Sequence, residues 1–346
     1  MHNCSLAIYF FDTKVGGVPT ASRLLGTQLM NKYDVIYHPI ELSLVRKIGS
    51  NVSQFLPFEF KRLIIRHFKP SKQSQITDRS CFRIFTHPSL ALLNPGENNC
   101  SILWYHDSWE FAKRIGHADQ IRKLNPLLFS TVFLSEGDSL FASREGMRNV
   151  INIFNPILSH TLGTTSRDKK FVMLTRHSKQ KAIHKAILAW KLSKLSDQNY
   201  VLAIYGKGAL KSLNLAFSKL LRVKNVEFHN HTDSAQDILA TARGLVSSSI
   251  HEGMPLIFLE AIAKNTPFIT FNSSPGCEEL ANYFKGFDLL VNSTLELSKA
   301  LDRIATIDSE EENRFRELCR EFYMTHNLSG WNRAWRKLLD SYEHNH

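Results

Sequence analysis

The alternation of short apolar runs with longer amphipathic segments is the feature that most limits what this chain can fold into. The runs are rich in β-branched and aromatic residues, which favour strands. Six occur in the first half, at Leu6–Phe11, Val35–His38, Phe82–Thr86, Ser101–Tyr105, Thr131–Ser135 and Val150–Asn155. Five follow, at Phe171–Thr175, Val201–Tyr205, Val226–His229, Leu245–Ser248 and Pro267–Phe271. Continuous apolar strands separated by helices form parallel sheets that are covered on both faces.

The predicted fold class is therefore α/β, with two Rossmann-like, doubly wound parallel-sheet domains facing a cleft. The 346 residues suffice for two domains of roughly 100–200 residues each. The polar stretch Ser159–Lys170 lacks periodicity, so we expect one domain over 1–158 and a second over 159–324. Because parallel sheets bind ligands at the carboxyl ends of their strands, functional residues are expected in the loops that follow the runs.

Charge and cysteine usage limit the partners and the compartment. Lys and Arg number 43 against 32 Asp and Glu, and the net charge of +11 favours phosphates, nucleic acid or anionic lipid. The five cysteines are widely spaced and form no CxxC pair, which argues against a disulfide framework or a zinc site and is typical of a reducing cytoplasm. No apolar run reaches the ~18–20 residues of a membrane span, so we expect neither an exported nor an integral protein.

Much of the excess positive charge lies between residues 46 and 83. Nine basic residues against two acidic ones give this region a net charge of nine minus two, or +7. Within it, residues 53–69 carry apolar side chains at helical spacing and basic side chains on another face. One interpretation is a helix that docks on an anionic membrane surface. The other is a sheet-covering helix with a solvated basic face.

The segment Ser247–Phe271 joins two buried strands through a polar turn and an apolar helix. Glu252 lies in the turn and Glu260 lies in the helix, about 7.5 Å along the axis from its proline. The backbone N–H groups of Gly253 and Met254 lie between them, at a helix start that attracts anions. A nucleotide sugar, anionic in the middle and hydroxyl-rich at both ends, would satisfy every group. The alternative is a capping Glu252 and a surface Glu260.

Basic residues follow the strand Phe171–Thr175, at its carboxyl end. Arg176 comes first, and Lys179 and Lys181 precede the next helix. An Arg fork and a Lys ammonium would hold the two phosphates of a departing nucleoside diphosphate. The chain has no Asp-x-Asp and no cluster at metal-ligand spacing, so no metal is expected. The alternative is that these are solvated charges at a helix start.

Two features of the first half are weaker candidates. Gly16 and Gly17 predict a turn before a helix that starts near Pro19, and paired glycines let a backbone approach a ligand closely. His106 and Asp107 directly follow a predicted strand, where a side chain would face the cleft. A plain tight turn and a structural histidine are the alternatives.

Together these segments resemble the retaining glycosyltransferases of family four, which have the glycosyltransferase B fold. Their Glu-x(7)-Glu signature matches HEGMPLIFLE, and LEAIAKNTPFI is close to its usual continuation. The segment TRHSKQKAIHKAI is similar to the family's phosphate-binding segment, YVLAIYGKGA to its strand and glycine turn, and NSSPGCEEL to its glycine-and-glutamate loop. The first half matches more loosely, as in KVGGV and WYHDS.

The resemblance implies roles for the matched residues of the second half. Glu260 would bind the ribose hydroxyls. Arg176 and Lys181 would bind the diphosphate, with Lys179 as an alternative to Lys181. Glu252 and the two backbone N–H groups that follow it would bind the transferred sugar.

Other roles are implied for the first half and the chain end. His106 would contact the sugar, and the Gly16-Gly17 turn would approach the phosphate or acceptor. The base would lie near Val226–His229, with Phe228 as the candidate contact. A last helix at about 325–346 would pack back onto the first domain through one apolar face.

The implied activity is retaining, metal-independent transfer of a hexose from a nucleotide sugar, with UDP as the expected nucleotide and no cofactor. The expected acceptor is a surface glycan or lipid-linked glycan, as in lipopolysaccharide, capsule or O-antigen. We expect a cytoplasmic protein, peripheral on the inner face of the membrane through residues 46–83. The alternative is a catalytically silent nucleotide- or glycan-binding homologue. Nucleic acid is not expected as a partner, because the aromatic residues fit apolar core stripes.

Overall fold

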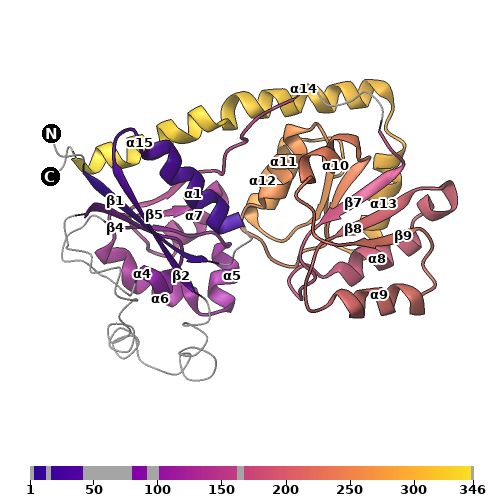
Figure 1. Cartoon of the computed structure of the whole chain (residues 1–346), viewed down its shortest axis with the longest axis horizontal. Helices are drawn as coiled ribbons and strands as arrows, with labels where there is room; N and C mark the ends of the chain where they lie inside the picture. Colours follow the sequence, from indigo (N-terminus) through magenta and orange to yellow (C-terminus); the bar gives the residue numbers. More distant parts are fainter. Residues whose placement is uncertain (1–3, 13–16, 42–79, 92–100, 162–166, 344–346) are drawn as a thin grey trace. The chain divides into compact units, whose positions relative to one another are not determined.

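The computed structural model describes residues 4–12, 17–41, 80–91, 101–161 and 167–343 (Figure 1). Its chain divides into two compact units. Unit 1 comprises Met1–Phe154 and Trp331–His346, and unit 2 comprises Asn155–Gly330. The basic segment predicted at 53–69 and Gly16 lie outside the described residues.

The described part of unit 1 is built on six parallel strands in the order β2-β1-β3-β4-β5-β6. These are β1 (Ser5–Asp12), β2 (Asp34–Glu41), β3 (Ser80–Phe85), β4 (Ser101–Trp104), β5 (Ser130–Phe133) and β6 (Val150–Asn152). The helices include α1 (Gly17–Leu29), α4 (Pro88–Ala91), α5 (Trp109–Arg114), α6 (His117–Leu124), η1 (Asn125–Leu127) and α7 (Glu136–Arg144). Leu6 and Ile8 on one face of β1 and Ala7 and Tyr9 on the other are all buried, so helices cover both faces of the sheet.

Buried Asp138 connects two helix starts at the carboxyl ends of β4 and β5. Its carboxylate accepts hydrogen bonds from the backbone N–H of Trp109, at 2.7 Å, and from the hydroxyl of Ser135. Ser135 in turn accepts the backbone N–H of Asp138 and caps α7. This carboxylate is therefore fully used in ordering the two loops, because a buried polar group is stable only when it is hydrogen-bonded.

The last helix, α15 (Leu328–Glu343), belongs to unit 1 from Trp331 onward. Its buried residues are Trp331, Trp335, Leu338 and Leu339, and these form the apolar face that their spacing predicts. The ring of Trp335 lies 5.0 Å from that of Trp104 in β4. Lys32 adds hydrogen bonds to Asp340, at 2.7 Å, and to Glu343. The chain end thus packs on the sheet formed by the first half of the sequence.

The described part of unit 2 has a parallel sheet in the order β12-β11-β10-β7-β8-β9. Its strands are β7 (Lys170–Leu174), β8 (Val201–Tyr205), β9 (Val226–His229), β10 (Gly244–Ser247), β11 (Phe268–Phe271) and β12 (Leu290–Val291). Its helices include α8 (Ile183–Leu192), η2 (Leu195–Gln198), α9 (Lys211–Leu220), α10 (Ala235–Thr241), α11 (Leu256–Ala263), α12 (Pro275–Tyr283), α13 (Thr294–Ala305) and α14 (Ser309–His326).

The two-unit α/β fold with parallel sheets confirms the predicted fold class, and all eleven predicted strands occur within a few residues of their predicted bounds. Strand β12 was missed, because two residues are too short to produce an apolar run. The prediction of a Gly16-Gly17 turn was wrong at Gly17, which is the first residue of α1.

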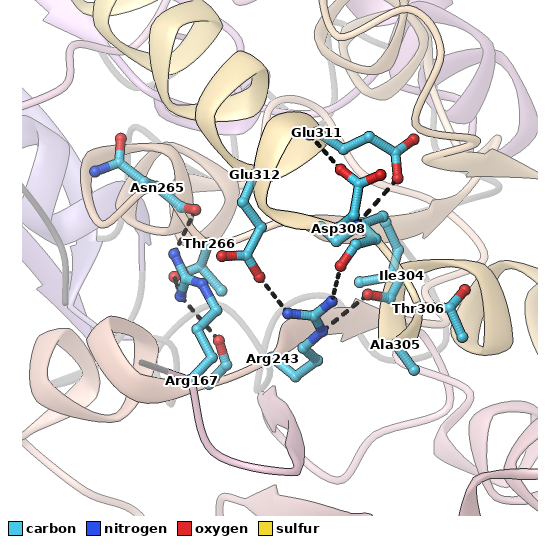
Figure 2. A network of polar contacts seen from close by, with 12 residues as sticks. Arg167, Arg243, Asn265, Thr266, Ile304, Ala305, Thr306, Asp308, Glu311 and Glu312 are labelled. Atoms are coloured by element: carbon cyan, nitrogen blue, oxygen red, sulfur yellow. Dashed lines mark hydrogen bonds and ion pairs between the residues drawn. The ribbon is translucent and has the colours of Figure 1, made fainter. Parts of the chain in front are cut away.

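A polar network connects the amino ends of β7 and β10 to the helix start that follows α13 (Figure 2). Arg243 precedes β10, and its guanidinium bonds Glu312 of α14 and the carbonyl oxygens of Ile304 and Ile307, the latter two at 2.9 Å. Arg167 precedes β7 and bonds the carbonyl oxygen of Asn265 at 2.7 Å. Each guanidinium thus satisfies carbonyl groups left unpaired at helix and strand ends.

Cys4 is in a disulfide bond, which was not predicted, whereas Cys277 and Cys319 are free and buried. Across the described ranges, none of the helices combines the length and the apolar composition needed to span a membrane.

Candidate active site

A hollow opens at the carboxyl ends of β7 and β10. It is lined by Met173, Leu174 and Thr175 from the end of β7, by Lys181, by Leu245–Ser249 from β10 and its loop, and by Glu252, Pro255 and Ile257. Six of the lining residues are apolar and six are polar or charged, and the two charged ones are Lys181 and Glu252. The topology places the site where an open parallel sheet ordinarily binds its ligand.

Lys181 and Glu252 form an ion pair in this hollow. The Lys181 Nζ lies 2.5 Å from Glu252 Oε1, and the two side chains are 20% and 10% exposed. An ammonium and a carboxylate are therefore held side by side in a position of restricted solvent access. The ammonium can bind an anion and the carboxylate can accept hydroxyl hydrogen bonds, so together they fit a ligand that carries both groups.

The loops that carry this pair are hydrogen-bonded to each other. The backbone N–H of Ile250 donates to the carbonyl oxygen of Gln180 at 2.9 Å, and the Gln180 side-chain amide donates to the carbonyl oxygen of His251 at 3.0 Å. The Ser248 hydroxyl donates to the carbonyl oxygen of Lys181 at 2.9 Å. These hydrogen bonds fix the loops after β7 and β10 relative to each other, and so position the ion pair. No residue spacing in the sequence indicated them.

A glycine turn after β8 supports the loop that follows β7. Gly206 and Gly208 have φ values of 155° and 151°, in a region that other residues rarely adopt. A Cβ at Gly206 would lie 1.9 Å from the carbonyl oxygen of Thr175, and one at Gly208 would lie 2.5 Å from that of His177. The backbone N–H of His177 donates to the carbonyl oxygen of Lys207 at 2.9 Å. Only glycine allows the two loops to approach this closely.

The structure distinguishes the three basic candidates. Lys181 lines the hollow and contacts Glu252. Arg176 and Lys179 are exposed, and neither makes an ion pair or side-chain hydrogen bond with another described residue. Arg176 directly follows the strand end that lines the hollow, whereas Lys179 lies farther along the loop. Of the two lysines left open by the sequence, Lys181 is the one beside the predicted carboxylate.

Glu260 lies on α11, the helix that begins after Pro255. Its side chain is partly buried, and burial raises the pKa of its carboxyl group. It has no hydrogen-bond or ion-pair partner among the residues that the structure describes. Glu260 does not line the hollow around Glu252, so the two carboxylates of the signature occupy different surroundings.

Gly253 and Met254, between these carboxylates, are buried and packed against the start of α12. The Ser274 hydroxyl donates to the carbonyl oxygen of Gly253 at 2.8 Å. A Cβ at Gly276 would lie 2.6 Å from the same oxygen, so α12 can approach only because Gly276 has no side chain. The glycine-and-glutamate loop singled out in the sequence therefore supports the turn that follows Glu252.

The predicted base-binding segment is β9, at the edge of the unit 2 sheet. Phe228 is partly buried, and its ring centroid lies 6.0 Å from that of His177. The rings of Tyr205 and His229 stack at 4.4 Å, and Lys211 holds the carbonyl oxygen of His229 at 2.7 Å. Aromatic rings thus lie on both sides of the β8–β9 edge, where a planar base can stack.

His106 and Gly17 belong to unit 1. His106 follows β4, and its ring lies 4.3 Å from that of Trp104. Burial lowers the pKa of the imidazole, which is therefore neutral at neutral pH and acts as a hydrogen-bond donor or acceptor rather than as a cation. The described residues of the chain hold no group of three His, Cys, Asp or Glu side chains arranged to bind a metal ion.

Known proteins that are similar to this chain are glycosyltransferases. Residues 157–322 match the family model described as glycosyl transferases group 1. An uncharacterized glycosyltransferase from Haemophilus influenzae is 26% identical over 230 residues, covering 63% of each chain. This chain therefore spans less than two thirds of that relative's length.

Solved structures share the fold at low sequence identity. TarM of S. aureus, in a complex with fondaparinux, alpha-GlcNAc-glycerol and UDP, is 16% identical with a TM-score of 0.65, over 75% of this chain and 55% of that one. WaaG, a glycosyltransferase involved in lipopolysaccharide biosynthesis, is 13% identical with a TM-score of 0.67, over 96% and 99% of the two chains. Residues 157–322 thus match the group 1 glycosyl transferases, and the two units have the glycosyltransferase B fold of such solved structures.

Proposed function

We propose that the protein transfers a hexose from a UDP-sugar to a glycan acceptor, with retention of configuration at the anomeric carbon and without a metal ion. The observation that carries the proposal is the Lys181–Glu252 pair in the hollow at the strand ends. Complexes of related folds with UDP, such as that of TarM, support the choice of nucleotide.

In this proposal, basic side chains neutralise the phosphates, a role that Mg²⁺ has in a metal-dependent enzyme. Lys181 and Arg176 would contact the diphosphate, and their charge stabilises the negative charge that grows on the leaving group as the glycosidic bond breaks. When a phosphate binds the Lys181 ammonium, the Glu252 carboxylate loses this partner and can accept a hydrogen bond from a sugar hydroxyl. The ion pair thus holds both groups in place until the donor binds.

The remaining site residues bind the ends of the donor. Glu260 would accept hydrogen bonds from the ribose hydroxyls, and Phe228 would contact the base. The N–H groups of Gly253 and Met254, and neutral His106 from unit 1, would contact the transferred sugar. No side-chain nucleophile is assigned, because the leaving phosphate can accept the acceptor's proton.

For the acceptor we propose a surface glycan or a lipid-linked glycan, as in lipopolysaccharide, capsule or O-antigen synthesis. The likeness to WaaG and the net charge of +11 support this choice. A cytoplasmic location at the inner face of the membrane follows from such an acceptor.

The test is donor binding and turnover by the purified chain, with and without EDTA. We expect UDP and one UDP-sugar to raise the melting temperature, because a ligand that binds only the folded state stabilises it. EDTA should leave the shift unchanged, Arg176→Ala should reduce it, and the anomeric configuration of the transferred or hydrolysed sugar should match that of the donor.

Three outcomes would contradict parts of the proposal. Loss of the shift in EDTA would contradict metal independence. Inversion at the anomeric carbon would contradict the retaining mechanism. Nucleotide binding without transfer or donor hydrolysis would favour a silent homologue.

A further inference from the structure

Helix α9 exposes apolar side chains and buries polar ones. Leu220 is 80% exposed, more than any other large apolar side chain in the described ranges, and Leu213 is 64% exposed. Asn214 and Ser218, on the opposite face, are buried. A sheet-covering helix ordinarily has the reverse arrangement. In Figure 1, α9 runs along the outer margin of unit 2, next to α8.

The buried polar residue has a partner inside unit 2. The Asn214 side-chain amide lies 3.1 Å from His177 Nδ1, and His177 is held by the carbonyl oxygen of Lys207 in the glycine turn. The inner face of α9 therefore contributes to ordering the loop of the candidate active site. This contact explains why Asn214 is inside, but it gives no reason for leucines outside.

The exposed apolar side chains form a continuous strip. Leu213, Ala216 and Leu220 are spaced by three and four residues, which places them on one face of the helix. Lys191, in the last turn of α8, donates to the carbonyl oxygen of Leu221 at 2.8 Å, so the carboxyl ends of α8 and α9 meet. Leu192, next to Lys191, is 52% exposed and adds apolar surface at this end.

Basic side chains border the strip, and acidic ones are missing from its segment. Residues 207–224 contain five basic residues and no Asp or Glu. Lys207, Lys219 and Arg222 are exposed and make no ion pair with another described residue. Lys224 pairs with Asp197, with both side chains about three quarters exposed, so this contact is easily exchanged. The surface around the leucines is therefore positively charged.

We infer that α9 docks on an anionic lipid membrane, with Leu213 and Leu220 inserted at the headgroup boundary and Lys207, Lys219 and Arg222 against lipid phosphates. A short helix with an apolar ridge and a basic border has the composition of an interfacial helix. Each basic residue near an anionic surface strengthens binding about fivefold, and each leucine removed from water strengthens it about tenfold or more. This surface is distinct from residues 46–83.

The experiment is co-sedimentation of the full chain with vesicles of phosphatidylcholine containing phosphatidylglycerol, and with vesicles of phosphatidylcholine alone. We expect binding to the anionic vesicles that weakens as salt is raised. The double variant Leu213→Gln/Leu220→Gln should reduce partitioning at least tenfold, and Lys219→Glu/Arg222→Glu by a similar factor. Leu295→Gln, at a leucine 56% exposed on α13, is the matched control and should bind as the wild type does.

Separate measurements keep the outcomes distinct. All three variants change exposed residues, so the free energy of unfolding and the thermal shift with UDP should match those of the wild type. Failure of UDP to bind the wild type would count against the proposed function and leave this inference standing. Equal partitioning of the wild type and the α9 variants would overturn the inference, as would no binding of the wild type to anionic vesicles. A wild-type dimer that only the α9 leucine variant dissociates, with unchanged vesicle binding, would identify the strip as an interface between copies and would equally overturn it.

Discussion

Unit 2 holds two charged clusters at opposite ends of one parallel sheet, and they differ in how far their hydrogen-bonding capacity is used. At the amino ends, Arg243 bonds a carboxylate and two backbone carbonyl groups, and Arg167 bonds further carbonyl groups (Figure 2). At the carboxyl ends, Lys181 and Glu252 bond each other, while Arg176 and Glu260 have no described side-chain partner. A saturated cluster stabilises the fold. A cluster with spare donors and acceptors is available to a ligand.

The comparison also explains why charge alone is a poor guide to function. Both clusters contain partly buried ionic groups, and both lie at strand ends. The difference lies in the backbone: helix ends and strand starts at the Arg243 cluster offer carbonyl groups that consume guanidinium N–H groups. At the Glu252 cluster the loops satisfy their own backbone through Ser248 and Gln180, which leaves the charged side chains free to exchange partners.

The largest expected effect on stability is at the amino-end cluster. Arg243→Ala removes the donor to two carbonyl groups and leaves the partly buried Glu312 carboxylate with only the longer contact to Arg316, at 3.7 Å. It should lower the free energy of unfolding by about 3 kcal/mol. Urea unfolding of the full chain measures this. Lys224→Ala removes one member of an exposed pair and should change stability by less than about 0.5 kcal/mol. A similar decrease in the free energy of unfolding in both variants would show that the Arg243 network contributes no more to stability than an exposed ion pair does.

The second largest effect is on turnover at the carboxyl-end cluster. Glu252→Gln keeps the shape of the side chain but removes its charge, and should lower kcat by about 10²-fold while changing UDP affinity little. The same variant should unfold within about 1 kcal/mol of the wild type. Steady-state kinetics with the donor identified by thermal shift, together with UDP titration, separate the two effects. If UDP affinity fell as much as kcat, Glu252 would belong with the nucleotide rather than the sugar.

A third prediction distinguishes the two lysines of the loop after β7. Lys181→Met removes an ammonium from the hollow and should weaken binding of the nucleoside diphosphate about tenfold. Lys179→Met changes an exposed side chain outside the hollow and should weaken it no more than about twofold. Calorimetric titration with UDP gives both constants. The reverse order would transfer the phosphate role to Lys179.

The smallest expected effect concerns the pH dependence of stability at Glu260. Burial raises the pKa of this carboxyl group in the folded state, so the folded protein binds its proton more readily than the unfolded chain does. Its ionisation therefore opposes folding above the raised pKa, and that cost disappears as the pH falls below the ordinary carboxyl pKa of about 4.3. Glu260→Gln should raise the free energy of unfolding by less than about 1 kcal/mol at neutral pH.

The comparison for this prediction is the same pair of proteins at low pH. The stability difference between wild type and Glu260→Gln should vanish there, and UDP should bind the variant more weakly at neutral pH. A stability difference that persists unchanged at low pH would show that packing, rather than ionisation, sets the effect.

Several parts of the molecule were predictable from local sequence for an identifiable reason. Continuous apolar runs such as Phe171–Thr175 predicted the strands, because a strand buried on both faces needs no polar alternation. The spacing of Trp331 and Trp335 predicted the apolar face of α15, since helical periodicity is local. Glu252 and Arg176 follow predicted strands in the sequence, so their places after the strand ends were predictable as well.

Other features depend on contacts between distant segments and left no local signal. The position of Lys181 beside Glu252 depends on the hydrogen bonds that join the loops after β7 and β10. The need for glycine at 206 and 208 arises from the carbonyl groups of a loop some thirty residues earlier. The two-residue strand β12 exists because its neighbour β11 is already in place.

The sequence by itself determined the α/β class and the order of strands along the chain. It also determined which polar residues follow the carboxyl ends of the strands. Each of these follows from side-chain periodicity and loop chemistry. Only the tertiary structure decided which charges pair, which glycines are obligatory and which face of α9 meets solvent. Those outcomes depend on burial and on hydrogen bonds between segments that are far apart in the sequence. The hydrogen bond between the side chains of Asn214 and His177 is an example. A pattern of residues does not record which of its faces will be covered by another element.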